Sequence, residues 1–145
     1  MNANYRKASH TIYNLTVHLA WITKYRYKVL KWQVWEELKK QIRIICNELE
    51  VEIVSWSISQ DHVHILVSIP PSCSISKLLQ YIKWKTSRKL QMQFQDLKKK
   101  YWWQHLWARW YFACSTGNIT NDMIKDYIEH HFEENESEDT FRIED

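Results

Sequence analysis

Two histidines separated by one residue are the strongest candidates for chemistry in this sequence. His62 and His64 lie within residues 61–69, an apolar and β-branched run that predicts a buried strand. Because side chains alternate along a strand, both imidazoles are expected on one face, with Asp61 and Val63 on the other. Imidazole is the commonest protein ligand for a divalent metal, so the pair predicts a metal site. A hydrogen-bonded structural pair is the alternative.

A tyrosine and another histidine are expected to share one side of a helix near the C-terminus. Thr120 is a good N-cap for that helix, and Met123, Tyr127 and His131 follow each other at four-residue spacing. A hydroxyl and an imidazole would therefore project from successive turns. A tyrosine on an amphipathic helix is usually a packing residue, and only the histidine pair upstream makes Tyr127 a candidate nucleophile.

Basic and aromatic residues interleave in two segments. Residues 23–28 alternate cations with tyrosines, and the helix expected after Ser74 carries lysines and arginine on its outer face. Cations suit phosphate contact and aromatic rings suit base stacking, although a merely solvated surface has the same composition. The candidate DNA-binding residues are Lys24, Arg26, Lys83, Lys85 and Arg88.

The composition indicates one globular domain that binds a large partner. The chain has 145 residues, of which 45% are hydrophobic, with nine tryptophans and a single glycine. One domain of this size has a real core but does not need nine tryptophans. Aromatic residues are enriched at subunit contacts and on surfaces that stack unpaired bases. The excess therefore favours either a dimer or a platform for single-stranded nucleic acid.

The charge is distributed unevenly along the chain. The net charge is +3, but residues 133–145 hold seven of the seventeen carboxylates and one of the twenty basic residues. Residues 1–132 therefore carry nineteen minus ten, or +9, which suits a polyanion binder. Three widely spaced cysteines and no recognisable signal peptide or membrane span favour a protein of the cytoplasm, with reduced thiols.

The periodicity of the chain predicts an α+β fold. The order strand, helix, strand, strand, helix, strand, helix is that of a ferredoxin-like split β-α-β sandwich with an antiparallel sheet and an added C-terminal helix carrying the tyrosine. Residues 1–132 would form the domain and residues 133–145 an acidic tail. The expected elements are strand 13–22, helix 31–50, strand 51–57, strand 61–69, a helix from Ser74 to Leu90, a surface connection 91–106, strand 107–114 and a helix from Thr120.

Four stretches of the sequence resemble one known family. They are Trp-Ile-Thr-Lys-Tyr-Arg at 21–26, Asp-His-Val-His at 61–64, Ile-Lys-Trp-Lys-Thr-Ser-Arg at 82–88 and Trp-Ala-Arg-Trp-Tyr-Phe at 107–112. Together they are similar to the motifs of HUH endonucleases, and most of all to the insertion-sequence transposases of the TnpA type, which use a single tyrosine. The REP-associated tyrosine transposases are close relatives of that family.

Three departures from the family pattern matter for the site. Trp84 and Trp110 stand where the family has glycine. His131 stands four residues after the tyrosine, where the family has a glutamine that serves as the third metal ligand. The change keeps a nitrogen ligand but leaves the metal preference open, and His130 is the fallback ligand.

The resemblance implies a metal-dependent transposase and endonuclease of single-stranded DNA. Tyr127 would attack a phosphodiester to give a 5′-phosphotyrosine and a free 3′-hydroxyl, which allows cleavage, rejoining and DNA recombination without a nucleotide cofactor. His62, His64 and His131 would hold Mg²⁺ or Mn²⁺. Relatives of this type recognise DNA hairpins and work as homodimers that share active sites between subunits, in the cytoplasm of prokaryotes.

Two other functions agree with the same residues. One is a ferredoxin-like module that binds single-stranded nucleic acid without cleaving it, in which case Tyr127 and the histidine pair coincide by chance. The other is a domesticated single-tyrosine nuclease that acts on chromosomal repeats, which the residues do not separate from a mobile transposase.

Overall fold

The computed structural model describes residues 5–115 together with Met123, Asp126 and Glu129. These last three residues have helical backbone, whereas Tyr127, His130, His131 and the predicted boundary at residue 132 lie outside the described residues. The described elements in chain order are β1 (Arg6–Ala8), β2 (Thr11–Tyr13), β3 (Thr16–Ile22), the 3₁₀ turn η1 (Lys24–Arg26), α1 (Trp32–Glu48), β4 (Glu52–Ile58), β5 (His62–Ser68), α2 (Ile75–Gln93), α3 (Gln95–Lys100) and β6 (Phe112–Ser115).

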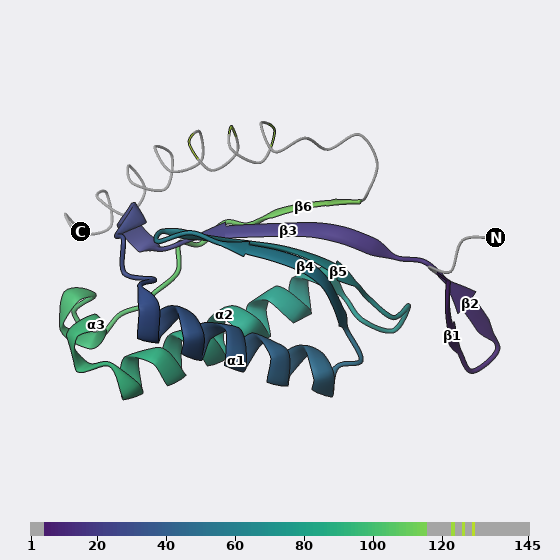
Figure 1. The fold of residues 1–145 in the computed structure, drawn as a ribbon, viewed down its shortest axis with the longest axis horizontal. Helices are drawn as coiled ribbons and strands as arrows, with labels where there is room; N and C mark the ends of the chain where they lie inside the picture. Colours follow the sequence, from purple (N-terminus) through teal and green to yellow (C-terminus); the bar gives the residue numbers. More distant parts are fainter. Residues whose placement is uncertain (1–4, 116–122, 124–125, 127–128, 130–145) are drawn as a thin grey trace.

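Four strands form an antiparallel sheet in the order β4-β5-β3-β6, and α1 and α2 cover one of its faces (Figure 1). This arrangement confirms the predicted ferredoxin-like α+β sandwich with its split β-α-β connections. β5 lies between β4 and β3, so the strand with the histidine pair is an interior strand of the sheet.

The hydrophobic core lies between the sheet and the two helices. Alternate residues of β3 and β5 point toward the helices because side chains on a strand alternate between its faces. The helices supply a stripe of residues at three- and four-residue spacing. The most deeply buried members of this core include Leu19, Trp21, Val63, Ile65, Leu38, Ile42, Ile45, Leu79 and Ile82.

The polar composition of residues 1–9 predicts a frayed segment, but residues 6–8, within its described part, form a strand. From residue 5 onward it enters an antiparallel ribbon of β1 and β2 that projects from one end of the sheet (Figure 1). The guanidinium of Arg6 fastens the ribbon by donating to the backbone oxygens of Ser68 at 2.9 Å and Glu50 at 2.8 Å. Sequence periodicity did not reveal this tertiary anchor.

The helix after Ser74 is longer than predicted. The Ser74 hydroxyl caps it by accepting from the backbone N–H of Lys77 at 3.4 Å, as expected. α2 then runs to Gln93, and α3 follows, so the predicted surface connection 91–106 was wrong up to Lys100. The final strand begins at Phe112 instead of residue 107.

The edge strand β4 shows why simple alternation failed there. The register with β5 shifts between Ile53 and Ser55, which is a β-bulge. Alternation along the strand would put Val54 on the same face as Trp56 and Ile58, but the bulge leaves Val54 exposed, and Ile53 packs against the core in its place.

Six non-glycine residues in the described part of the chain have left-handed backbone. Such a conformation is sterically unfavourable for any residue with a Cβ atom. Two of the positions are consecutive in η1 and two are consecutive after α3. The residues are His10, Tyr25, Arg26, Glu50, Trp102 and Trp103.

Candidate functional site

His62 and His64 lie together on the face of the sheet opposite α1 and α2. His64 is paired with Ala20 of β3 on one side and with Ser57 of β4 on the other. Both imidazoles are half-buried, whereas Val63 between them is fully buried in the core. The prediction that the two histidines share one face is therefore confirmed.

Strand alternation predicted Asp61 on the face opposite the two histidines. Its carboxylate instead contacts His62, the residue that follows it. Asp61 precedes β5, so the alternation of side chains along that strand does not apply to it. Oδ1 of Asp61 accepts from Nδ1 of His62 at 2.7 Å, and Oδ2 accepts from Nε of Arg26 at 2.9 Å. Burial by itself would raise the pKa of the Asp61 carboxyl, but these two hydrogen bonds and the charges of Arg26 and His62 together outweigh burial and lower the pKa.

The Asp61 carboxylate fixes the tautomer of His62. An imidazole that donates from Nδ1 has its lone pair on Nε2, which is then the nitrogen that can bind a metal. Carboxylate–histidine pairs of this kind commonly orient metal ligands. The sequence reasoning missed this role for Asp61, although the adjacency of Asp61 and His62 was a signal for it.

The turn after β3 holds Arg26 in place for this contact. Thr23 donates its backbone N–H to the Asp61 carbonyl at 2.9 Å and its hydroxyl to the Tyr27 carbonyl at 2.8 Å. Tyr25 and Arg26 take the left-handed backbone that turns the guanidinium toward Asp61. Arg26 was predicted to contact DNA, and the structure places its Nε on a carboxylate of the site.

A third histidine, which the sequence reasoning did not single out, borders the pair. Nδ1 of His18 on β3 lies 3.0 Å from Nε2 of His64, and the two rings stack with their centroids 5.3 Å apart. Burial, followed by the charges of His18 and His62, lowers the pKa of His64. Position 18 lies on the polar side of the alternating pattern of its strand, which was the available signal.

The described residues supply two candidate ligands for a divalent metal, His62 and His64. A metal ligand must be a neutral imidazole, and the lowered pKa keeps His64 neutral at neutral pH. Among the described side chains, no group of three or more histidine, cysteine, aspartate or glutamate residues is placed to hold a metal ion. A third ligand must come from elsewhere, and the predicted ones, His131 or His130, lie outside the described residues.

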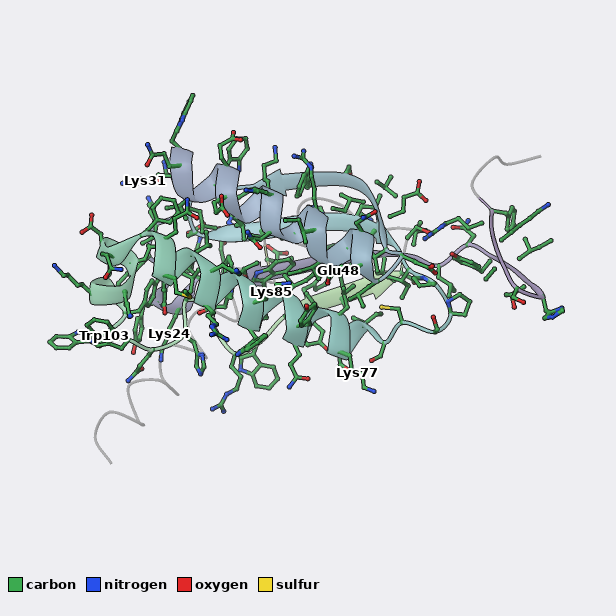
Figure 2. All side chains as sticks on the ribbon, turned by 90° about the horizontal axis from the view of Figure 1, so that it is seen from below. Lys24, Lys31, Glu48, Lys77, Lys85 and Trp103 are labelled. Carbon is green, nitrogen blue, oxygen red and sulfur yellow. The ribbon has the colours of Figure 1, made fainter. Side chains whose placement is uncertain are left out.

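The basic residues of α2 point in different directions. The amine of Lys85 lies between Glu48 of α1, at 4.0 Å, and the Tyr81 hydroxyl, at 3.2 Å (Figure 2). Lys83 is turned toward the backbone of residues 108–110, where burial lowers the pKa of its amine to about 8. Only Arg88 of the three predicted DNA contacts on this helix has an exposed side chain.

Lys24 lies on the side of α2 away from α1 (Figure 2). Its amine donates to Oε1 of Gln104 at 3.0 Å. None of the described contacts tests the predicted DNA-binding role of Lys24, Arg26, Lys83, Lys85 or Arg88, which stays a prediction.

Solved structures share this architecture. A candidate transposase from Deinococcus radiodurans R1 superimposes with a TM-score of 0.80 at 31% identity, over 86% of this chain and 96% of that one. The REP-associated tyrosine transposase, solved bound to a REP hairpin, gives a TM-score of 0.56 at 17% identity, over 87% and 68% of the two chains. The second likeness is one of fold alone.

Residues 11–131 match the family described as "Transposase IS200 like", and the chain belongs to that family. It is 34% identical over 129 residues to the transposase for insertion sequence element IS200 of Salmonella typhimurium, covering 89% of this chain and 84% of that protein. It is 32% identical over 124 residues to the ISDra2 transposase TnpA of Deinococcus radiodurans, covering 86% and 89%.

Membership confirms the resemblance found in the motifs and makes the protein an enzyme of the single-tyrosine, DNA-cleaving class. In the part of the chain that the structure describes, no helix is both long and apolar enough to span a bilayer.

Proposed function

We propose that the protein cuts and rejoins single-stranded DNA through a 5′-phosphotyrosine on Tyr127, with the help of Mg²⁺ or Mn²⁺. The observation that carries this proposal is the pair of half-buried imidazoles on one face of β5, the first of which is oriented by Asp61 at 2.7 Å. A structural histidine pair does not need a carboxylate that fixes one ring in its metal-binding tautomer.

The covalent step conserves the energy of the phosphodiester. The Tyr127 oxygen attacks phosphorus, the bond from phosphorus to the 3′ oxygen breaks, and the leaving oxygen takes up a proton as a free 3′-hydroxyl. Attack of a 3′-hydroxyl on the phosphotyrosine reverses these bond changes and releases the tyrosine. Rejoining therefore needs no nucleotide cofactor.

His62, His64 and His131 are the residues that would hold the metal. When bound, a divalent ion polarises a phosphoryl oxygen and offsets the negative charge of the transition state. All-nitrogen ligation favours manganese, whereas the greater cellular abundance of magnesium favours that ion.

Asp61 and Arg26 act on the site through His62. Asp61 keeps the imidazole in one orientation, and Arg26 at 2.9 Å keeps the carboxylate charged and fixed. His18 restrains the ring of His64 at the other ring nitrogen, since its Nδ1 lies 3.0 Å from Nε2 of His64. These three are positioning residues, because their contacts are with a candidate ligand or with the carboxylate that orients one.

Hairpin recognition and a shared active site complete the proposal. The solved relative bound to a REP hairpin supports a hairpin ligand for a chain of this fold. A homodimer in which the tyrosine of one subunit serves the histidines of its partner agrees with the excess of tryptophan over the needs of one core.

The proposed function is tested by trapping the covalent intermediate. The protein is incubated with Mg²⁺ or Mn²⁺ and single-stranded DNA that contains a hairpin and carries a label on the 3′ side of the cut. A labelled protein band on a denaturing gel is expected for the wild type and for Tyr111→Phe. It is expected to be absent for Tyr127→Phe.

Two results would contradict the proposal in different ways. An adduct that persists in Tyr127→Phe moves the nucleophile to another residue. Tight binding of the DNA with no adduct in the wild type indicates a module that binds single strands without cutting them.

A further inference from the structure

A groove of about 480 Å³ lies between α2 and residues 105–111, away from the histidine pair. None of the residues that line it contributes to the site on β5. Its volume lies in the range of about 300–1,000 Å³ that is usual for small-ligand sites. The side chains that give it its chemical character are Lys24, Lys83, Trp84, His105, Arg109 and Tyr111.

The wall opposite the helix is held in place by polar contacts from α2. Nζ of Lys83 donates to the carbonyl oxygens of Ala108 at 2.6 Å and Arg109 at 3.1 Å, and Oγ of Ser87 accepts from the backbone N–H of Leu106 at 3.1 Å. These contacts lie within the protein and fix the wall. A preformed wall lowers the entropic cost of binding one.

Residues 105–111 are also fastened to the end of β3. Ala108 donates its backbone N–H to the Ile22 carbonyl at 3.0 Å, and Lys24 donates its backbone N–H to the Leu106 carbonyl at 2.8 Å. The Trp107 indole N–H reaches Oγ1 of Thr86 in α2 at 2.9 Å. The segment is therefore fixed on both sides although it is not a strand.

Two exposed aromatic rings line the groove. Trp84 is 54% exposed and Tyr111 is 37% exposed, so neither ring serves mainly as core. Tyr81 stacks beside Trp84 along the helix with the ring centroids 6.4 Å apart, which supports the indole without covering it. Exposed aromatic faces of this kind stack unpaired bases regardless of sequence.

The charge of the groove is positive. Its lining includes Lys24, Lys83 and Arg109 and no carboxylate. The exposed side chain of Arg109 makes no hydrogen bond or ion pair with any other described residue. The guanidinium of Arg88 lies 5.8 Å from the centroid of the Trp84 ring, at the same wall. Cations beside an aromatic ring suit a ligand with both a phosphate and a flat ring.

We propose that this groove binds one unstacked nucleotide of single-stranded DNA. The base stacks against Trp84 and Tyr111, and the phosphate lies against Arg109 and Lys24. The identity of the polymer as DNA rests on the proposed function. Paired and stacked bases in a duplex have no free face, so the groove selects single strands over duplex.

Trp84 provides the first test, in a Tyr127→Phe background that prevents turnover. Binding of a fluorescent oligonucleotide of about 12 thymidines is followed by anisotropy at fixed salt. Trp84→Ala is expected to weaken binding roughly 5- to 150-fold, since one stacked base contributes about 1–3 kcal/mol. Trp84→Phe keeps an aromatic face and is expected to stay within about threefold of the parent.

Trp32→Ala is the matched control. Trp32 begins α1, is 82% exposed and does not line the groove, so its loss removes an exposed indole elsewhere. Binding within about twofold of the parent is expected. Circular dichroism and thermal unfolding of each variant check that the fold is intact.

Arg109→Gln provides an independent variant that leaves the aromatic rings in place. It is expected to weaken binding of all single strands and to reduce the slope of log affinity against log salt by about 0.7, the value of one phosphate contact to a single strand. An unchanged salt slope overturns the assignment of the phosphate to Arg109.

Two outcomes overturn the groove itself. One is a Trp84→Ala affinity equal to that of Trp32→Ala. The other is an equal loss by Trp84→Ala for a blunt duplex of about 12 base pairs, which offers no unstacked base. An adduct in the wild type together with either outcome leaves the cleavage function standing and removes the groove. Binding that depends on Trp84, with no adduct in the wild type, supports the groove and contradicts the cleavage function.

Discussion

Nδ1 of His62 and Oδ1 of Asp61 lie 2.7 Å apart, although the two residues are adjacent in sequence and strand geometry alone would place their side chains on opposite faces. The contact forms because β5 begins at His62, which leaves Asp61 free to turn back toward the imidazole. The candidate metal ligand, His62, and the carboxylate that orients it, Asp61, are thus consecutive residues.

Asp61→Asn is expected to weaken metal binding. The neutral amide accepts less strongly from His62 and cannot form the ion pair with Arg26, so the imidazole loses its fixed orientation. Changes in partners of this kind typically lower metal affinity about 10- to 100-fold. Calorimetric titration with Mn²⁺ measures the change. Glu48→Gln, which removes the partner of Lys85 on the helical layer, is the control, and equal affinities of the two variants would contradict the role of Asp61.

Acid should remove the stability that Asp61 provides. Its hydrogen bonds to His62 and Arg26 lower the folded-state pKa below the ordinary value of 3.8 despite burial. A carboxyl with a lowered folded-state pKa stabilises the protein above its unfolded-state pKa and loses this contribution as the pH falls through the folded-state value.

The free energy of unfolding of wild type and Asp61→Asn, measured with urea, should therefore differ most at pH 6 and converge as the pH falls below about 4. A difference that stays constant down to pH 2 would show that the carboxylate charge contributes nothing to the fold.

His62→Ala and His64→Ala should each abolish metal-dependent cleavage while costing little stability. Both side chains are half-buried on the face of the sheet opposite the core, so their removal leaves no cavity among the core residues. A loss of about 1 kcal/mol or less in urea unfolding is expected. Cleavage that continues at the wild-type rate in chelator, or unfolding of both variants, would restore a purely structural role for the pair.

Mixing two inactive variants should recover activity if the active site is shared between subunits. A heterodimer of Tyr127→Phe and His64→Ala contains one site with both an intact tyrosine and an intact histidine pair. Random pairing gives about half heterodimers, each with one working site, so partial recovery is expected. Co-expression with two different tags, followed by purification through both, isolates the heterodimer. Background cleavage by that species would show that each subunit completes its own site.

Local patterns predicted the sheet and the helices because those elements follow hydrophobic periodicity. The stripe of Leu38, Ile42 and Ile45 gave α1 within two residues, and the apolar alternation of β5 placed both histidines on one face. These predictions needed only each segment's own side chains and the existence of a core.

The same patterns failed where contacts distant in sequence decide the backbone. Residues 107–111 have the composition of a strand, yet they form only an isolated antiparallel bridge between Trp107 and Thr23, because Lys83 and Thr86 of α2 also bind this segment. His18 lies beside His64 only because β3 pairs with β5 in this register. Both facts depend on register, which a single sequence does not specify.

The scarcity of glycine in this chain leaves strained turns that substitution could relieve. Its single glycine is Gly117, so the left-handed turns at His10 and Glu50 are made by residues whose Cβ atoms oppose that conformation. Glycine at either position would relieve this strain far from the histidine pair. A protein stabilised in this way could then accept destabilising substitutions around β5, which makes these two turns the natural starting points for directed evolution of its specificity.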